Sequence, residues 1–439
     1  MSSLPIVRAY FATRMRRFRD RAALEAWQDQ QVCAHLERVV PRSRWLQERL
    51  AGRPVGEWRA MEPVGKAEMM ARFTDLNTVG LTLEDAMRVA LAAEDSRDFA
   101  PELNGVTVGL SSGTSGHRGL FVVPPAERQE WAGHMLARLL PHPLLWPRRD
   151  RVAFFLRANS NLYETTRSAR VRFEYFDLIE ELDAQESRLR ELDPTILVAP
   201  PSTLRRLARR RLAGSLVLSP IKVIAVAEVL DPLDERLIRR AFGQTVHQVY
   251  QATEGFLGHT CTYGTLHLAE DVMAVEREPL DDQRFVPVIT DFRRSAQPIV
   301  RYRLNDVLRL RPVPCRCGSP LTALAAVEGR DDDVFVGIRA DGTERPVFAD
   351  FIRRAVLTAH ADVADYGVRQ VAPDALEVFV EVVDGADPER VRAAVGAGLA
   401  AMFARLGCRE PAVTGIASWP EGGMRKRKRV ERGFAWTER

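Results

Sequence analysis

The segment around residue 115 combines glycines with hydroxyl groups in a way that is typical of phosphate-binding loops. It reads Ser111-Ser112-Gly113-Thr114-Ser115-Gly116-His117-Arg118-Gly119. Glycines let the backbone turn back and expose its N–H groups, which together with the hydroxyls form a nest for an anion. The segment lacks the Gly-Lys-Ser/Thr of a Walker loop and the Gly-x-Gly-x-x-Gly of a dinucleotide site. We therefore expect phosphate binding here, with an ordinary surface turn as the alternative.

A second motif directly follows an apolar run that predicts a strand. It reads Tyr250-Gln251-Ala252-Thr253-Glu254-Gly255. Parallel α/β sheets bind ligands at the carboxyl ends of their strands. At such an edge the Tyr250 ring suits stacking on a base, and the Glu254 carboxylate suits Mg²⁺, which prefers oxygen ligands. The alternative is a solvated turn beside a buried tyrosine.

Two further motifs follow along the chain. The stretch Ile299–Asp306 predicts a strand that ends in Asp306, whose carboxylate suits two ribose hydroxyls. The stretch Gly329–Asp333 is short, acidic and led by glycine, which favours a boundary between domains. Each of the two is also compatible with a charged surface turn.

Lysine is rare in this chain, although 63 residues are basic. The four lysines are Lys66, Lys222, Lys426 and Lys428. An ammonium is a compact point charge and a guanidinium is a planar fork, so a lysine kept in an arginine-rich chain indicates a position where arginine does not serve, with chance retention of the four lysines as the alternative. Two of the four fall in the basic run Gly422–Arg429. A basic run of this kind is typical either of a nucleic-acid-binding patch or of a solvated tail.

Two short pairs of residues have the chemistry of zinc ligands. They are Cys261-x₅-His267 and Cys315-x-Cys317. Such pairs in loops suit a closed tetrahedral Zn²⁺ site, and free buried cysteines with a surface histidine are the alternative. The chain has five cysteines in all, an odd and small number that does not indicate a disulfide framework. A reducing, cytoplasmic location is therefore expected.

The composition is that of an ordinary globular protein, with 46% hydrophobic and 28% charged residues. The formal charge is only +4, because 63 basic residues nearly balance 59 acidic ones, which argues against a nucleic-acid or membrane-surface partner. No apolar run approaches the roughly 18 residues of a membrane span. The arginine-rich N-terminus predicts an amphipathic helix, and an organelle transit peptide is the alternative.

The pattern of apolar residues predicts an α/β fold. Between residues 152 and 251, strand-like apolar runs alternate with helical stretches, which favours a sheet covered by helices. The expected strands are Val152–Leu156, Ile196–Ala199, Ile221–Ala227, Val246–Gln251, Val286–Thr290, Ile299–Arg303, Val307–Leu310, Leu376–Val382 and Val413–Ala417. The expected helices are residues 20–50, Ala184–Leu192, Ser202–Leu212, Leu233–Phe242, Ala349–Leu357 and Pro388–Leu406. We predict a large N-terminal domain of α/β subdomains with mixed sheets, residues 1–329, and a small, mobile α+β C-terminal domain, residues 330–439.

In this order and spacing, the four motifs resemble the adenylate-forming superfamily of acyl-CoA synthetases, peptide-synthetase adenylation domains and luciferases. The resemblance implies a nucleotide site made of Ser111, Ser112, Gly113, Thr114, Ser115, Gly116, Ala227, Glu228, Tyr250, Asp306 and Arg330. It implies catalytic roles for Thr253 and Glu254, with Glu254 also holding Mg²⁺. It further implies that Asp332 is the interdomain hinge. Lys426 is the implied catalytic lysine, and Lys428 is the second choice.

Within the superfamily the chain resembles the phenylacetate–CoA ligase branch. Pro63-Val64-Gly65-Lys66 and Cys315-x-Cys317-Gly318 support this, and the cysteine positions resemble a structural zinc site of those relatives. Three features depart from the pattern: Asn305 replaces a usual glycine, Ser319-Pro320 replaces a basic residue, and His117-Arg118-Gly119 replaces a Lys-Pro pattern. Coronafacate-ligase-like amide-forming enzymes share the Ser-Ser-Gly-Thr-Ser-Gly-x-Arg-Gly style of loop.

The resemblance implies a ligase that uses ATP and Mg²⁺ to make an acyl-adenylate from a small carboxylic acid. It implies transfer of the acyl group to CoA, or alternatively to an amine such as an amino acid, by a monomer or homodimer with a structural Zn²⁺. A catalytically inactive scaffold or a nucleic-acid-binding protein is the alternative outside this class. The acyl pocket is expected among five aromatic residues, for which a packed aromatic core is the alternative. They are Phe154, Phe155, Tyr163, Phe173 and Tyr175.

Overall fold

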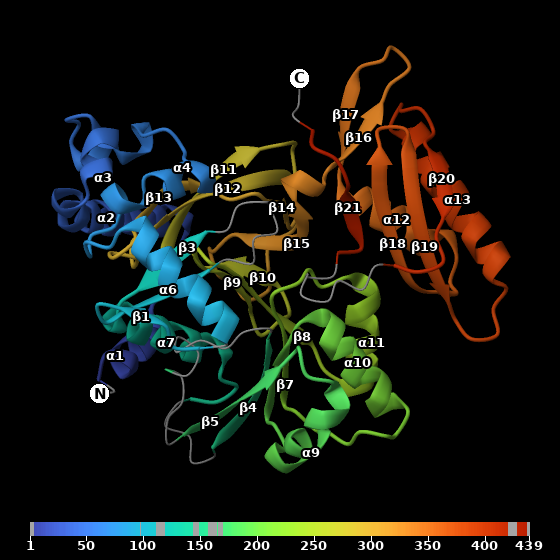
Figure 1. Cartoon of the computed structure of the whole chain (residues 1–439), viewed down its shortest axis with the longest axis horizontal. Coiled ribbons are helices and arrows are strands. Elements are labelled where there is room, and N and C mark those ends of the chain that lie inside the picture. Colours follow the sequence, from blue (N-terminus) through green and yellow to red (C-terminus); the bar gives the residue numbers. More distant parts are fainter. Residues whose placement is uncertain are drawn as a thin grey trace. The chain divides into compact units, whose positions relative to one another are not determined.

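The computed structural model describes residues 4–96, 98–110, 119–143, 149–156, 165, 170–419 and 428–436. The chain divides into two compact units (Figure 1). The first unit is Met1–Leu230, Asp234–Leu304 and Leu310–Ala325, and the second unit is Asp231–Leu233, Asn305–Arg309 and Ala326–Arg439. The chain crosses from one unit to the other along β14 (Asp306–Leu310) and β15 (Ala323–Arg330).

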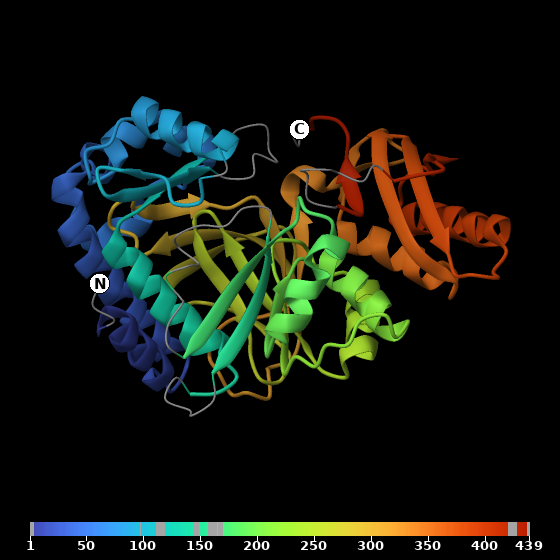
Figure 2. The ribbon, with the colours of Figure 1, turned by 60° about the horizontal axis from the view of Figure 1, so that its bottom comes forward.

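A parallel sheet forms the centre of the first unit. Its strands, in spatial order, are β5 (Val171–Asp177), β4 (Asp150–Leu156), β6 (Ile196–Ala199), β7 (Lys222–Ala225) and β8 (Val246–Ala252). Helices α9 (Leu182–Leu192), α10 (Pro201–Leu212) and α11 (Pro232–Phe242) alternate with them along the chain. Parallel neighbours need a crossover connection, and each of these helices provides one. The helices lie on one face of the sheet, where they share a core with its strands (Figure 2).

Successive residues of these strands enter two different cores. Phe155, Leu197 and Val223 pack under α9–α11, whereas Phe154 and Val198 face the core on the other side of the sheet. That second core includes residues of α1 (Leu4–Met15), α2 (Arg21–Val39) and α7 (Pro125–Leu139). A strand that is buried on both faces reads as a continuous apolar run, which is why these strands could be recognised in the sequence.

Beyond β8 the sheet becomes antiparallel. β9 (Gly255–Thr260) pairs with β8 and with β10 (Leu266–Leu268), which pairs with β15. β11 (Met273–Pro279), β12 (Arg284–Asp291) and β13 (Ile299–Arg303) form a second antiparallel ladder. A small sheet of β1 (Glu102–Leu103), β2 (Val106–Leu110) and β3 (Leu120–Val123) shares a core with α6 (Leu83–Ser96). The first unit therefore has mixed sheets, as expected from the sequence.

The N-terminal segment is helical, as predicted, and α1 packs against α7. Gly133 in α7 allows the close approach, since a Cβ atom there would lie 2.6 Å from Cβ of Ala9. The helix expected at residues 20–50 is instead three pieces, α2, η1 (Val40–Arg42) and α3 (Arg44–Leu50). Pro41 interrupts the helix because it has no N–H to donate, and Ser43 restarts it by capping Leu46 N. Short helices η2 (Val55–Ala60), α4 (Lys66–Ala71) and α5 (Phe73–Leu76) follow.

The second unit is a small α+β structure with a core of its own. Its four-stranded sheet has the order β20 (Ala412–Gly415), β19 (Ala375–Val382), β18 (Val363–Ala372), β21 (Val430–Arg432). Helices α12 (Ala349–Ala359) and α13 (Pro388–Arg405) share a core with this sheet. A hairpin of β16 (Phe335–Ile338) and β17 (Glu344–Val347) follows the turn η3 (Asp331–Asp333). Among the described residues, no helix is long and apolar enough to cross a membrane.

Candidate nucleotide and metal sites

Thr253 and Glu254 form the two-residue turn between β8 and β9. Ala252 pairs with Gly255 across the turn, and the register shifts between Tyr250 and Gln251. β8 is parallel to β7 on one side and antiparallel to β9 on the other. The turn therefore lies at the carboxyl end of the last parallel strand, an edge where α/β sheets bind their ligands.

The Glu254 carboxylate is held by a tyrosine from another strand. Tyr302 in β13 is 3% exposed, and its hydroxyl donates to Oε1 of Glu254 at 2.8 Å. The other oxygen, Oε2, has no hydrogen-bond partner among the residues that the structure describes. A carboxylate with one oxygen oriented and the other available fits a hard cation such as Mg²⁺.

A pocket beside this carboxylate brings Lys66 into the site. The pocket is small and open to solvent, and it is lined by Lys66, Met69, Gly119, Leu120, Phe121, Thr253, Glu254, Arg294, Gln297 and Ile299. Lys66 lies here because Val64, two residues earlier, bonds to the backbone of Arg301 and Arg303 at 2.9 Å on either side of Tyr302. The pocket thus combines an ammonium, a carboxylate and a hydroxyl.

Sequence reasoning assigned no role to Lys66, Arg294, Gln297 or Tyr302. The rarity of lysine was a signal for Lys66, and Tyr302 lies inside a motif singled out for its aspartate. Arg294 and Gln297 carry no local signal, since apart from the bond between them their contacts in the site lie far away along the chain.

The residues expected to line adenine lie at the same edge of the sheet. Ala227 follows β7, the parallel neighbour of β8, and has a φ of +67°, which costs free energy for a residue with a side chain. The Glu228 carboxylate accepts a hydrogen bond from Ser202 N at 3.2 Å in the first turn of α10. The Glu228 N–H donates to the Val226 carbonyl at 2.8 Å, so both the backbone and the side chain of Glu228 are engaged next to β7.

Other candidates lie elsewhere. Ser111–Gly116 and Lys426 lie outside the described residues. Asp306, Arg330 and Asp332 belong to the second unit, where the Asn305 amide donates to Asp332 Oδ2 at 3.1 Å. This exposed hydrogen bond links Asn305 to the turn η3, which contains Asp332.

Lys428, the second choice for the catalytic lysine, is engaged within the second unit. Its Nζ lies 2.5 Å from Oδ2 of Asp333, a carboxylate that is 8% exposed. Burial raises the pKa of Asp333, and Lys428 opposes that shift. The ion pair favours a structural role for Lys428.

The aromatic residues proposed for an acyl pocket do not share one environment. Phe155 stacks on Phe176 under α9–α11, with ring centroids 4.7 Å apart. Phe154 lies on the opposite face of the sheet, 5.2 Å from Phe173. Phe155 therefore cannot line the same pocket as Phe154, because adjacent strand residues face opposite sides. Tyr163 lies outside the described residues.

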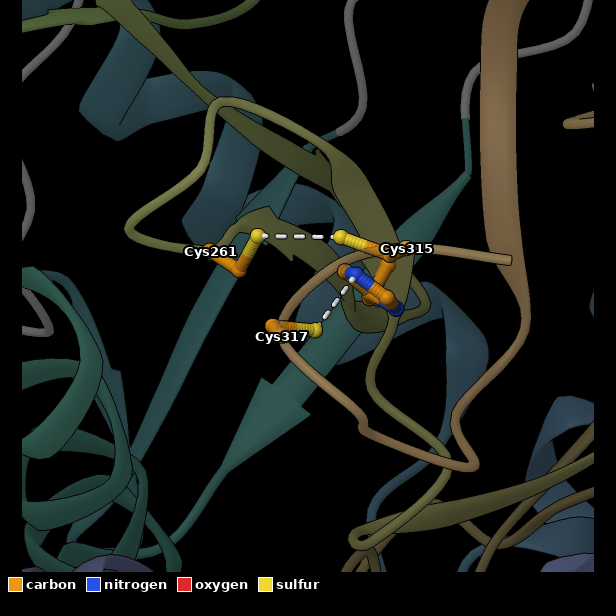
Figure 3. Close-up of side chains that lie close together, drawn as sticks. Cys261, Cys315 and Cys317 are labelled. Atoms are coloured by element: carbon orange, nitrogen blue, oxygen red, sulfur yellow. Dashed lines mark hydrogen bonds between the residues drawn. The ribbon is translucent and has the colours of Figure 1, made fainter. Parts of the chain in front are cut away.

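The four candidate zinc ligands come together in the first unit. The ligand atoms of Cys261, His267, Cys315 and Cys317 all lie within 4.8 Å of one another, and the three sulfur atoms converge (Figure 3). Sγ of Cys261 and Sγ of Cys315 are 3.7 Å apart, close to the roughly 3.8 Å separation that a tetrahedral ion with Zn–S bonds of about 2.3 Å requires. That the cluster binds zinc stays a prediction.

Two glycine turns shape this cluster. Gly264 and Gly318 both have a φ near +70° to +80°, and their N–H groups bond back to the carbonyls of Cys261 and Cys315. Glycine is favoured at such positions because it adopts positive φ without steric cost. Each turn folds the chain directly behind a thiol and leaves its sulfur pointing into the cluster.

The imidazole of His267 is oriented for a metal. Its Nδ1 lies 3.1 Å from the Leu321 carbonyl, so Nδ1 carries the proton and Nε2, 3.4 Å from Cys317 Sγ, faces the cluster as a lone pair. Burial disfavours the thiolate of Cys315, but hydrogen bonds from Thr265 and the Cys317 backbone lower its pKa to about 6. Burial and the neighbouring thiols raise the pKa of Cys317 to about 11. The neighbouring thiols disfavour one another's ionised form, and a bound dication such as Zn²⁺ would stabilise all of the thiolates.

No protein-family model matches the chain, and no curated protein matches it. Solved structures do match. A 2-hydroxyisobutyryl-CoA ligase in the postadenylation state, in complex with 2-HIB-AMP, has a TM-score of 0.64 and 18% identity over 94% of this chain and 89% of that chain. The amide bond synthetase McbA from Marinactinospora thermotolerans has a TM-score of 0.52 and 16% identity over 76% and 68% of the two chains. The coronafacic acid ligase from Pectobacterium brasiliense has a TM-score of 0.50 and 11% identity over 97% and 96%.

At these identities the likeness shows a shared fold. The predicted fold class, an α/β region of mixed sheets with a separate small α+β unit, is confirmed. It is the fold of ligases of the kind that the sequence motifs resembled.

The cluster geometry predicts about one Zn²⁺ per chain in elemental analysis of the purified protein, because four ligands complete a structural site. Replacing Cys317 by serine should abolish stoichiometric binding. Removing the ion should lower the free energy of unfolding by about 3 kcal/mol or more, the linkage expected at a hundredfold excess of the ion over its Kd. Cys33→Ser is the matched control, since Cys33 lies outside the cluster. A metal-free protein of unchanged stability would contradict the assignment.

Proposed function

We propose that the protein is an ATP-dependent ligase that activates a small carboxylic acid as an acyl-adenylate. The observation that carries the proposal is the Glu254 carboxylate, which Tyr302 orients at the carboxyl end of the parallel sheet, beside Thr253 and Lys66 in one pocket. The fold shared with a ligase solved in complex with 2-HIB-AMP supports the same function. The sequence motifs that resemble the adenylate-forming superfamily support it independently.

In the first step, a carboxylate oxygen of the acid attacks the α-phosphorus of ATP. The bond from that phosphorus to the α,β-bridging oxygen breaks, and pyrophosphate leaves with the electron pair. Negative charge spreads over the phosphate oxygens, so fixed donors supply most of the stabilisation. The residues proposed as donors are the Ser111–Gly116 segment and Thr253.

Glu254 is proposed to hold Mg²⁺, which neutralises phosphate charge when it is bound. The Tyr302 hydroxyl orients the Glu254 carboxylate in advance, so that little reorganisation is needed when the nucleotide arrives. Tyr250, Ala227 and Glu228 are proposed to form the adenine side of the site. In the second unit, Asp306 is proposed to bind ribose and Arg330 to contact the nucleotide.

In the second step, a nucleophile attacks the acyl carbon, loses its proton and displaces AMP. We propose CoA as the acceptor, because the structural match with a TM-score of 0.64 is to a CoA ligase. An amine acceptor is the second candidate. The matches to an amide bond synthetase and a coronafacic acid ligase favour it, together with the Ser-Ser-Gly-Thr-Ser-Gly-x-Arg-Gly style of loop.

The two units are proposed to act as two domains, divided near residue 329 and hinged at Asp332, so that the second unit presents different faces in the two steps. Lys426 is proposed to contact the acid and the α-phosphate. The ion pair between Lys428 and Asp333 supports Lys426 rather than Lys428 in that role. The protein is further proposed to hold a structural Zn²⁺ and to act in the cytoplasm as a monomer or dimer. It is proposed to have no nucleic-acid or membrane partner.

The proposal predicts acid-dependent exchange of labelled pyrophosphate into ATP without any acceptor. A panel of carboxylic acids identifies the substrate. Glu254→Gln should lower the exchange rate by roughly a hundredfold or more, because a group that stabilises transition-state charge is lost. Glu278→Gln is the matched control, since Glu278 pairs with Arg303 at the surface and should leave exchange unchanged. Full exchange in the Glu254→Gln variant would contradict the metal assignment.

A second prediction separates the two lysines of the basic run. Lys426→Ala should lower exchange by roughly a hundredfold, since the developing phosphate charge loses a point charge. Lys428→Ala should retain exchange but lower the free energy of unfolding, because the buried Asp333 loses its partner. Exchange rates and urea melts of both variants test this. Loss of exchange in Lys428→Ala alone would move the catalytic role to Lys428, and binding of nucleic acid without exchange would favour the non-enzymatic alternative.

A further inference from the structure

Arg294 joins the Thr253–Glu254 turn to the small sheet of the first unit. It lies in the segment between β12 and β13. Its Nη1 donates to the carbonyl oxygens of Thr253 at 3.1 Å and Glu254 at 3.3 Å. Its Nη2 donates to the Val122 carbonyl in β3 at 3.3 Å. One planar guanidinium thus bonds both backbone segments that line the pocket.

Gln297 completes the connection on the side of β3. Its Oε1 accepts from Nη2 of Arg294 at 3.1 Å and from Val122 N at 3.0 Å, and its Nε2 donates to the Leu120 carbonyl at 3.1 Å. Gln297 is 1% exposed, so these bonds are made away from water. The amide therefore fixes β3 at the point where this strand begins, and it fixes the guanidinium as well.

Two acids, the half-buried Glu127 and the buried Asp291, hold the segment that carries Arg294. Glu127 accepts from Ser295 N at 2.9 Å and from Ala296 N at 2.7 Å, and Asp291 accepts from Arg293 N at 2.8 Å. Burial raises the pKa of Glu127 to about 7 and that of Asp291 to about 6, and the charge of Arg294 opposes both shifts. The positive charge of Arg294 thus favours the ionised form of both acids, and their negative charge in turn favours a guanidinium in this segment.

We propose that Arg294 and Gln297 are positioning residues that set the place of the Glu254 carboxylate, and so determine the affinity of the site for the divalent cation that accompanies the nucleotide. Mg²⁺ demands near-ideal ligand geometry, so a small displacement of one carboxylate weakens its binding. Neither side chain needs to touch the metal, because Arg294 acts through the carbonyl groups of the turn. Gln297 acts indirectly, through its bonds to Arg294 and to the backbone of β3. The inference rests on the proposed function for the identity of the ligand.

The hydrogen bonds of Arg294 and Gln297 to the turn and to β3 are called the brace below. Arg294→Lys and Gln297→Met test this brace, with Arg293→Lys as the matched control. Lysine keeps the positive charge near Glu127 and Asp291 but has no planar fork to bond both segments. Methionine keeps the length of glutamine without its hydrogen bonds. Arg293 instead pairs with Glu130 and does not line the pocket.

Two measurements are made on the full-length protein. The first is binding of Mn²⁺ in the presence of ATP, followed by electron paramagnetic resonance, and the second is the Mg²⁺ dependence of pyrophosphate exchange. Arg294→Lys and Gln297→Met should each weaken Mn²⁺ binding by about tenfold or more, the usual effect of losing an outer-shell partner of a metal ligand. The Mg²⁺ concentration for half-maximal exchange should rise by the same factor, and saturating Mg²⁺ should restore the rate. Arg293→Lys should change neither quantity.

Unchanged Mn²⁺ binding in both variants would overturn the inference. A loss of exchange that saturating Mg²⁺ does not restore would also overturn it, because that result indicates general disruption rather than positioning. If the unsubstituted protein shows no exchange with any acid, the proposed function fails, and Mn²⁺ binding with ATP alone then decides whether the brace sets cation affinity.

Discussion

The position of the Thr253–Glu254 turn is the constraint on which the rest of the site depends. It lies where β8 changes from a parallel neighbour on one side to an antiparallel neighbour on the other. A two-residue turn contains no further residues that could orient the Glu254 carboxylate, so groups outside the turn must orient it. Tyr302 does this through the side chain of Glu254, and Arg294 does it through the carbonyl groups of the turn.

This arrangement brings charged groups together away from full exposure. Asp291 is buried, Arg294 and Glu127 are half-buried, and burial raises the pKa of both acids. Apolar residues would cost less free energy at these positions. We infer that the cost is retained because a site for a polyphosphate works by rigid placement, and errors of about 1 Å are expensive. The cluster of Cys261, His267, Cys315 and Cys317 lies at the opposite end of β9, in turns that a bound metal would hold without taking part in chemistry.

Much of the fold could be predicted from the sequence, because strands such as β6 and β13 are bounded apolar runs that match the structure residue for residue. Residues 20–50 are almost entirely helical, as expected, but Pro41 divides them into three pieces, because a proline inside a helix carries no local cue to how the chain restarts after it. Phe155 packs under α9–α11, on the side of the sheet opposite to Phe154, which matches the packed-core alternative. Within the site, only residues in contiguous motifs could be singled out. Arg294 and Gln297 could not, since apart from each other their partners in the site lie at least 40 residues away along the chain.

The central claim is that a carboxylate oxygen attacks the α-phosphorus of ATP. The most direct test uses an acid labelled with ¹⁸O in its carboxylate and a complete reaction with its acceptor. The account predicts that the AMP produced carries one ¹⁸O atom per turnover, because the bridging oxygen of the acyl-adenylate stays with AMP when the acyl group is transferred. Unlabelled AMP, or ¹⁸O recovered in inorganic phosphate together with ADP, would contradict it.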